Sequence, residues 1–209
     1  MNIELNQIAK RYRKEWIFES VSMNFNSNSQ TSVVGNNGSG KSTLLQIVSG
    51  YLSPTRGDIK WALGDKAIAR DEVFRYVSIC SPAVQLWDEL TLQENISLFL
   101  EFKKLPGYNT SRDFASKIQL EKNLNQPLKT FSSGMKQRVK LGLAILSDSP
   151  ILLLDEPCSH LDHAAVEWYQ TLLQSNLEGK ILLVASNRDK RETFLCKQEI
   201  DINLHKHQP

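Results

Sequence analysis

The feature that most constrains this chain is a glycine-rich stretch between an apolar run and a run with helical periodicity. It reads Gly35-Asn36-Asn37-Gly38-Ser39-Gly40-Lys41-Ser42-Thr43, which fits the pattern G-x-x-x-x-G-K-[ST]. Glycines let the backbone approach an anion closely, and the amides of the loop and of the following helical turn then point at one place. The stretch predicts a loop that binds nucleotide phosphates, and every residue in it is a candidate contact. Lys41 is expected to reach the β- and γ-phosphates, and Ser42 to offer its hydroxyl to Mg²⁺.

Hydrophobic periodicity predicts strands that alternate with helices along most of the chain. Residues 151–154 and 181–185 are wholly apolar, which is typical of parallel strands buried on both faces. With the phosphate loop, this order predicts an α/β fold of the P-loop NTPase type, with a mostly parallel core sheet, an N-terminal antiparallel β part and a small helical insertion. Strands are expected at 2–9, 17–25, 30–34, 59–61, 76–80, 151–154, 181–185 and 199–204. Helices are expected at 43–49, 95–102, 111–120, 135–146, 163–177 and 191–195, and a polar tail after residue 204.

The alternation of strands and helices is interrupted between residues 91 and 130, where the pattern is helical and broken by Pro106 and Gly107. We expect one domain over residues 1–209. Residues 1–90 and 131–209 would form a nucleotide-binding core, and about 91–130 a helical subdomain.

Composition excludes several classes of protein. The net charge of +2 gives no global field that would attract nucleic acid, and no direct nucleic-acid contact is expected. The three cysteines form no C-x-x-C pair, which favours reduced thiols in a cytosolic protein over disulfides or a metal centre. No run of 18 apolar residues is present, so no segment is expected to span a membrane, and any membrane role requires a partner.

A buried strand that ends in two carboxylates supplies the second candidate site. Asp155 and Glu156 follow the apolar run 151–154 directly. Because α/β proteins bind ligands at the carboxyl edge of the sheet, Asp155 is placed to hold Mg²⁺ together with Ser42. Glu156 lies one residue further out, where a general base would polarise an attacking water. An acidic turn without a chemical role is the alternative, and the upstream phosphate loop weighs against it.

A third run opens a helix with a Ser-x-Gly turn, a further potential anion site. It reads Phe131-Ser132-Ser133-Gly134-Met135-Lys136-Gln137-Arg138. Together with the phosphate loop, the run Leu-Leu-Leu-Asp-Glu-Pro and the later Ser159-His160-Leu161-Asp162, in this order, it resembles the ATP-binding-cassette (ABC) ATPases. The resemblance covers nearly the whole chain. It implies that the cofactors are ATP and Mg²⁺.

The resemblance also implies a dimer, either of two copies or of this chain with a paralogue. In that family the signature run of one subunit closes over the γ-phosphate held by the other, a role that falls here to Ser132-Ser133-Gly134. The run departs from the commonest Leu-Ser-Gly-Gly-Gln, and its Ser-Gly-Met-Lys-Gln form is a familiar variant. Ser159-His160-Leu161-Asp162 resembles the loop that couples the two ATP sites, with Ser159, Leu161 and Asp162 as the coupling residues.

One aromatic residue upstream matches a further position of the family. Tyr12 suits the residue that stacks on the adenine ring, and Trp16 is its competitor. A half-packed surface aromatic in a basic turn is the alternative reading for either residue.

Two family elements are altered. The glutamine loop usually follows the strand at 76–80 directly, but Cys80-Ser81-Pro82 stands there and the nearest glutamine is Gln85. Gln85 is therefore either a ligand of Mg²⁺ or a plain loop residue. Asn187 stands where the family normally has a histidine that contacts the γ-phosphate, and an amide can donate a hydrogen bond but cannot carry a proton. Hydrolysis with Glu156, Lys41 and Asn187 as catalytic residues is therefore expected to be slow.

These observations predict the ATP-binding and ATP-hydrolysing subunit of an ABC transporter, cytoplasmic and bound to the inner face of a membrane through a separate integral permease. The compact chain resembles small exporter-type subunits of the family. One alternative is a soluble ABC-type ATPase switch acting on nucleic acid or ribosomes, which the single cassette and short insertion disfavour. Another is a slow-hydrolysing regulatory protein, which Asn187 allows.

Overall fold

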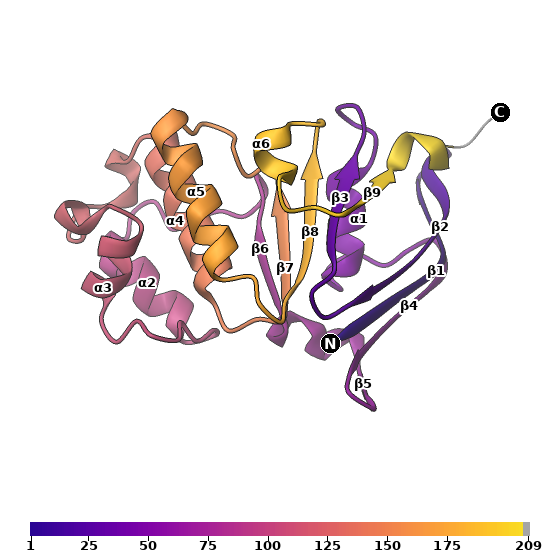
Figure 1. Cartoon of the computed structure of the whole chain (residues 1–209), viewed down its shortest axis with the longest axis horizontal. Helices are drawn as coiled ribbons and strands as arrows, with labels where there is room; N and C mark the ends of the chain where they lie inside the picture. The colour runs from indigo at the N-terminus through magenta and orange to yellow at the C-terminus, as the bar shows by residue number, and fades with distance from the viewer. Residues whose placement is uncertain (207–209) are drawn as a thin grey trace.

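The computed structural model describes residues 1–206 of the chain and contains two sheets (Figure 1). The central five-stranded sheet has the order β6-β7-β8-β3-β9, and every neighbouring pair in it is parallel. The predicted parallel core is thus confirmed. Its strands are β3 (Gln30–Val34), β6 (Val77–Cys80), β7 (Ile151–Asp155), β8 (Ile181–Ser186) and β9 (Gln198–Asp201).

The second sheet is the predicted antiparallel part, with four strands in the order β2-β1-β4-β5. Its strands are β1 (Asn2–Tyr12), β2 (Glu15–Asn26), β4 (Arg56–Leu63) and β5 (Lys66–Ile68). β1 runs on to Tyr12, so the basic turn predicted between the first two strands contains only residues 13–14. β4 contains the strand predicted at 59–61 but begins three residues earlier and ends two residues later, and the short β5 was not predicted.

The helices lie close to their expected positions. They are α1 (Lys41–Val48), α2 (Leu92–Leu100), α3 (Ser111–Lys117), α4 (Ser133–Leu146), α5 (His163–Ser175) and α6 (Lys190–Thr193). Short 3₁₀ helices cover Arg70–Arg75, Glu121–Asn123, Leu128–Thr130 and Ile202–His205. The last of these corrects the strand predicted over 199–204. That strand ends at Asp201, because the Asp201 side chain accepts a hydrogen bond from the Asn203 amide and starts a helical turn. The predicted tail lies partly in 207–209, outside the described residues.

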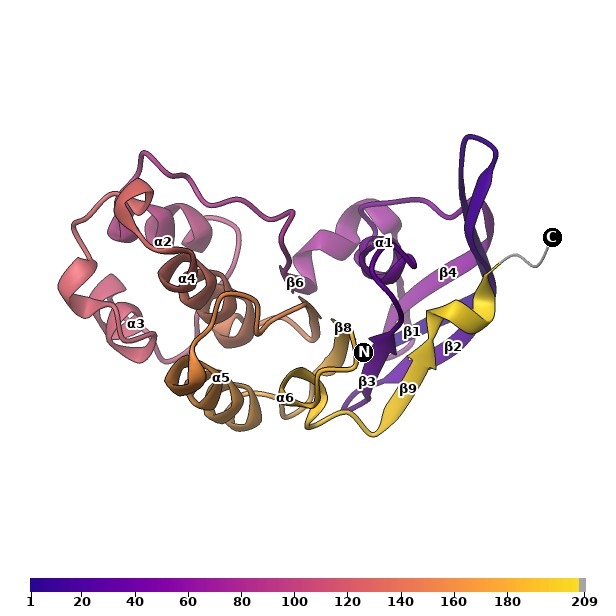
Figure 2. The same cartoon turned by 90° about the horizontal axis from the view of Figure 1, so that it is seen from above.

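The central sheet separates two hydrophobic cores. Alternate residues of β7 divide between them: Ile151 and Leu153 pack with α1 and the antiparallel sheet, whereas Leu152 and Leu154 pack with α4 and α5. Seen from above, the helical side and the antiparallel side flank the sheet (Figure 2). Burial on both faces explains why this strand is wholly apolar and why the carboxyl edge after it holds a fixed position.

The helical segment, residues 91–130, rests on α4. Gly142 of α4 permits the close approach, since a Cβ there would lie 2.4 Å from Ile118 Cγ2 and 3.0 Å from Phe114 Cζ. The same helix begins at Ser133, within the Ser-Ser-Gly run, so the segment and that run share one rigid support. None of the helices in the described part of the chain has the length and hydropathy needed to cross a bilayer.

Candidate functional site

The phosphate loop connects β3 to α1 through a backbone that only glycine accommodates at its tightest points. Gly40, which directly precedes α1, has a φ of 105°, and a Cβ there would lie 2.5 Å from Ile17 Cγ2. At Gly35 a Cβ would lie 2.6 Å from Ser39 Oγ and 2.7 Å from Ile202 Cγ2. Within residues 1–206, Ser39 Oγ is the one buried side-chain polar atom without a hydrogen-bond partner. The loop therefore combines a compact backbone, a helix N-terminus and an unsatisfied hydroxyl, which fits a bound phosphate.

Lys41 extends back over this loop and is almost fully buried. Its Nζ donates to the carbonyl oxygens of Gly35 at 2.9 Å and Asn36 at 3.0 Å, and to Asn187 Oδ1 at 2.6 Å. Burial lowers the pKa of Lys41, whereas the nearby Glu156 and other carboxylates act in the opposite direction. The ammonium is thus held at the mouth of the loop, where it would meet the terminal phosphates.

Asn187, directly after β8, joins three parts of the site. Its Oδ1 accepts from Lys41, and its Nδ2 donates to Asn37 Oδ1 at 2.6 Å and to Glu156 Oε1 at 3.2 Å. The structure therefore brings together all three residues that the sequence predicts to be catalytic. The contact between Asn187 and Glu156 was not predicted.

Glu156 adopts a left-handed backbone conformation, with a φ of 48°, at the turn after β7. Its amide donates to the Ala185 carbonyl of β8 at 2.9 Å, and its own carbonyl accepts from the Ser159 amide at 3.0 Å. These bonds fix the direction in which the Glu156 side chain leaves the sheet.

Asp155 ends β7 next to the phosphate loop. Burial raises the pKa of its carboxyl, and a hydrogen bond from the Ser42 hydroxyl acts to lower that pKa. The two predicted Mg²⁺ ligands therefore contact each other. Among residues 1–206 no group of three or more His, Cys, Asp or Glu side chains could bind a metal ion alone. A metal here would have to share its coordination with other donors, as Mg²⁺ does in nucleotide sites.

The Ser132-Ser133-Gly134 run lies at the start of α4 and packs against the predicted coupling loop. Ser132 caps the helix by accepting from the Met135 amide at 3.2 Å. A Cβ on Gly134 would lie 2.9 Å from the His160 carbonyl oxygen, so the two segments touch. Asp162 in turn caps α5, accepting from the Ala165 amide at 2.8 Å. In the described part of the chain no hydrogen bond or ion pair joins the Ser-Ser-Gly run to the phosphate loop of the same subunit.

Tyr12 and Trp16 line a groove of about 800 Å³ that reaches Gly38 of the phosphate loop. Tyr12 is 46% exposed. The Trp16 ring is already covered by the guanidinium groups of Arg11 and Arg56, at 5.0 and 4.8 Å from its centroid. A cation also lies over the Tyr12 ring, with Lys10 Nζ at 5.0 Å from its centroid. The stacking role of Tyr12 therefore stays a prediction.

Gln85 is exposed in the loop before α2. It lines hollows with Gln137 and Lys140 of α4. Within residues 1–206 no hydrogen bond connects Gln85 to Ser42 or Asp155. Its role as a Mg²⁺ ligand stays a prediction without a supporting contact.

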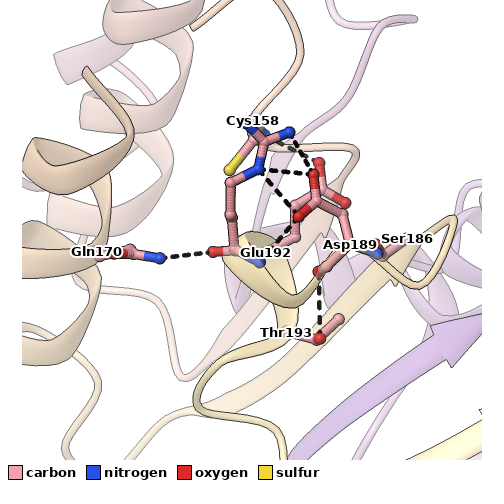
Figure 3. Close-up of polar contacts among 7 residues, drawn as sticks. Cys158, Gln170, Ser186, Asp189, Glu192 and Thr193 are labelled. Carbon is pink, nitrogen blue, oxygen red and sulfur yellow. Dashed lines mark hydrogen bonds and ion pairs between the residues drawn. The ribbon is translucent and has the colours of Figure 1, made fainter. Parts of the chain in front are cut away.

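Sequence reasoning missed Glu192, which lies in α6 close to Cys158 and Ser186 (Figure 3). A single acidic residue in a four-residue helix gives no periodic signal. Its burial and its contacts appear only in three dimensions.

A glycine-rich loop with its lysine, and a carboxylate pair at the carboxyl edge of a parallel sheet, define a P-loop nucleotide-binding protein. Residues 18–159 match the ABC transporter family, and the chain belongs to that family. It is an ATP-binding subunit of an ABC transporter, as predicted from its motifs.

Curated relatives share the cassette over nearly the whole chain. The uncharacterized ABC transporter ATP-binding protein YybJ of Bacillus subtilis is 29% identical over 203 residues, covering 96% of this chain and 92% of YybJ. The spermidine/putrescine import ATP-binding protein PotA of Legionella pneumophila is 31% identical over 211 residues, covering 98% of this chain but 57% of PotA.

Solved structures show the same fold. A putative ABC transporter ATP-binding protein from Pyrococcus furiosus matches with a TM-score of 0.82 at 19% identity, covering 99% of this chain and 100% of its own. The cassette MJ0796, in a dimeric post-hydrolysis state bound to ADP and Pi, matches with a TM-score of 0.80 at 25% identity, covering 96% of this chain and 94% of its own. The predicted P-loop fold is confirmed.

Proposed function

We propose that this chain hydrolyses ATP with Mg²⁺ in a dimer of cassettes and thereby drives a separate membrane permease. The observation that carries the proposal is the position of Asn187, whose amide bridges Lys41 and Glu156 beside the phosphate loop. Lys41 and the loop amides would hold the phosphates, and Glu156 would orient and deprotonate the attacking water. Asn187 contacts both side chains, so the lysine and the carboxylate lie on either side of it next to the phosphate loop.

Mg²⁺ would be bound by Ser42 and Asp155 together with phosphate oxygens. The contact between these two side chains supports this, since both offer oxygen atoms next to the loop. The ion would neutralise charge that develops on the phosphates. The protein would orient the ion and the phosphates.

Dimerisation would complete each ATP site with residues of the other subunit. The signature serines Ser132 and Ser133 are exposed, and MJ0796, with the same fold, forms a dimer that holds ADP and Pi. We therefore assign Ser132-Ser133-Gly134 to the ATP bound by the partner subunit, and Ser159, Leu161 and Asp162 to coupling between the two sites. The partner is a second copy or a paralogue.

The permease would dock on the helical subdomain, residues 91–130, and on the loop that holds Gln85. An apolar groove of about 330 Å³ lies there, and Leu98, Phe99 and Leu143 are among the residues that line it. Docking would place the chain at the cytoplasmic face of a membrane. Purification in mild detergent should recover the chain with a multi-span membrane protein. Recovery of the chain alone from such extracts would contradict the docking.

We also propose that hydrolysis is slow. Asn187 contacts Lys41 and Glu156 through its amide, but it cannot take up a proton or carry the positive charge of a histidine. Charge that develops on the γ-phosphate would therefore be stabilised less than with an imidazolium.

The experiment that tests the function is Glu156→Gln. The variant keeps the shape and the hydrogen bond to Asn187 but loses the base, so ATPase activity should fall at least about 100-fold while ATP still binds. Size-exclusion chromatography with MgATP should then show a stable dimer that is absent without nucleotide. Glu178→Gln, an exposed residue remote from the site, is the matched control and should behave as the wild type. Full ATPase activity in the Glu156→Gln variant would refute the assignment.

A further inference from the structure

A buried carboxylate connects the two loops that carry the proposed catalytic residues (Figure 3). Glu192 of α6 is 5% exposed, and its Oε1 accepts from the Cys158 amide at 3.1 Å. The Ser186 hydroxyl also hydrogen-bonds to this carboxylate, and Ser186 Oγ accepts from the Asp189 amide at 3.1 Å. We call Glu192, Ser186 and the Cys158 amide the carboxylate clamp.

The clamp spans two separate segments of the chain. Cys158 lies just after Glu156 and directly before the coupling loop, whereas Ser186 ends β8 directly before Asn187. Near the site these segments are also joined by the Glu156 amide, which donates to the Ala185 carbonyl at 2.9 Å, and by Asn187 Nδ2, which donates to Glu156 Oε1 at 3.2 Å. The clamp adds a tie further along both segments. Ties at separate positions fix the relative orientation of the two loops, which a single bond does not.

The helix that carries Glu192 is itself anchored. The Tyr169 hydroxyl of α5 donates to the Glu192 main-chain carbonyl at 3.4 Å, and Gln170 Nε2 donates to the Arg191 carbonyl at 3.0 Å. Asp189 caps the helix and pairs with Arg191 at 2.6 Å. The Glu192 carboxylate is therefore held by an anchored helix rather than by a loose turn.

Burying the Glu192 carboxylate has a cost in desolvation free energy. Burial raises the pKa of Glu192, as expected when a charge is removed from water, while the bonds from Ser186 and Cys158 act to lower it. Apolar side chains of similar volume fill buried positions without this desolvation cost. What an apolar side chain lacks is an acceptor for the Cys158 amide.

We propose that Glu192 is a positioning residue for ATP hydrolysis, which sets Glu156 and Asn187 relative to each other through its bonds to Cys158 and Ser186. It is not itself a catalytic residue, and it acts through the two loops that it joins. The inference rests on the proposed function, because it concerns the geometry of that same site. It also links the coupling loop after Cys158 to the site, so a shift of that loop would reach Glu156 and Asn187 together.

The test compares Glu192→Met with Glu192→Gln. Methionine fills the space without bonding the Cys158 amide, so kcat should fall about tenfold while KM stays within about threefold. Glutamine offers an oxygen to Cys158 and an amide to Ser186 Oγ, and it should restore most of the lost kcat. A fluorescent ATP analogue measures binding directly and should show unchanged affinity in both variants.

Two further variants separate positioning from general stability. Ser186→Ala removes a single buried hydroxyl of the clamp and should lower kcat in the same direction with KM unchanged. Ser147→Ala removes a buried hydroxyl that bonds to the Ala144 carbonyl at 3.1 Å, outside α6 and the clamp, and it should leave kcat at the wild-type value even if thermal unfolding shifts. If Glu192→Met fails to fold, Ser186→Ala compared with Ser147→Ala decides the question.

Three results would overturn the inference: unchanged kcat in Glu192→Met and Ser186→Ala, a loss confined to KM, or a Glu192→Gln variant as slow as the methionine variant. Its failure is distinct from a failure of the proposed function, which would appear as retained ATPase activity in Glu156→Gln.

Discussion

The phosphate-binding site and the helical segment of residues 91–130 are stabilised by different kinds of interaction. At the site, the Lys41 ammonium and the Asn187 amide bond to backbone carbonyls and to side chains from several loops. In the helical segment, Phe114 and Ile118 pack into the space above Gly142, and the two helices begin at hydrogen-bonded threonine caps.

Because of this difference, a substitution should have different structural effects in the two regions. A polar network is directional, so removing one member leaves others unsatisfied and displaces the rest. Apolar packing on one helix is not directional, and a defect there lowers stability without re-aiming the catalytic groups. We therefore expect substitutions in the helical segment to reduce the free energy of unfolding while ATP affinity stays unchanged.

The largest effect is expected from Lys41→Ala. The variant loses the ammonium that faces the phosphates and leaves the carbonyls of Gly35 and Asn36 without their donor. ATP affinity should fall at least about 100-fold, the size of a lost charge-assisted contact, and nucleotide-dependent dimerisation should disappear with it. Equilibrium binding of a fluorescent ATP analogue and chromatography with ATP measure both. Lys60→Ala, an exposed lysine of β4, serves as control, and ATP-dependent dimers of the Lys41 variant would contradict the prediction.

Gly142→Ala should affect the helical segment of residues 91–130 and not the phosphate-binding site. The added Cβ would lie 2.4 Å from Ile118 Cγ2, so the helical segment must shift away from α4. We expect the free energy of unfolding to fall by about 2 kcal/mol, because the overlap outweighs the roughly 1 kcal/mol that alanine gains in a helix. Denaturant titration measures this, and ATP affinity should stay within about twofold of the wild type.

The double variant with Ile118→Ala checks the cause of that loss. Removing Cγ2 relieves the overlap, so the two substitutions together should cost less than the sum of their separate effects. Additive costs would show that the contact is not responsible.

A smaller effect is expected from Asn187→His. An imidazole in this place can carry charge toward the γ-phosphate, and turnover should rise about tenfold, equivalent to about 1.4 kcal/mol in the barrier. Steady-state ATPase assays at saturating MgATP measure it. An unchanged or lower rate would count against the proposal that Asn187 limits hydrolysis. Asn187→Ala, which keeps neither bond, should be slower than the wild type.

The same comparison explains what the sequence could predict. β3 was predicted to the residue and the helix after the loop to within two residues, because an apolar run followed by a glycine-rich stretch leaves a strong local pattern. Asp155 was placed correctly next to Ser42, since a strand buried on both faces has a definite carboxyl end. Such features depend on neighbours in the chain.

Contacts between segments that are far apart in the sequence leave no local sequence pattern from which they could be predicted. The bond between Asn187 and Glu156 joins residues 31 positions apart, and it depends on β7 and β8 lying side by side in a given register. Glu192 is buried because α6 folds back against Cys158, which periodicity cannot report for so short a helix. Family resemblance supplied the role of Asn187 but not its partners.

The smallest effect should come from Thr91→Ala at the start of α2. Thr91 Oγ1 accepts from the Glu94 amide at 3.2 Å, and Glu94 Oε2 accepts from the Thr91 amide at 2.8 Å, which forms a capping box. Loss of the hydroxyl should lower the free energy of unfolding by about 1 kcal/mol, the usual cost of an N-cap. Thr91→Ser keeps the hydroxyl and should recover most of the stability in the same denaturant titration. Because the cap lies in the helical segment, kcat and ATP affinity should not change, and a Thr91→Ala variant with impaired hydrolysis would show that the two regions are coupled more tightly than their contacts imply.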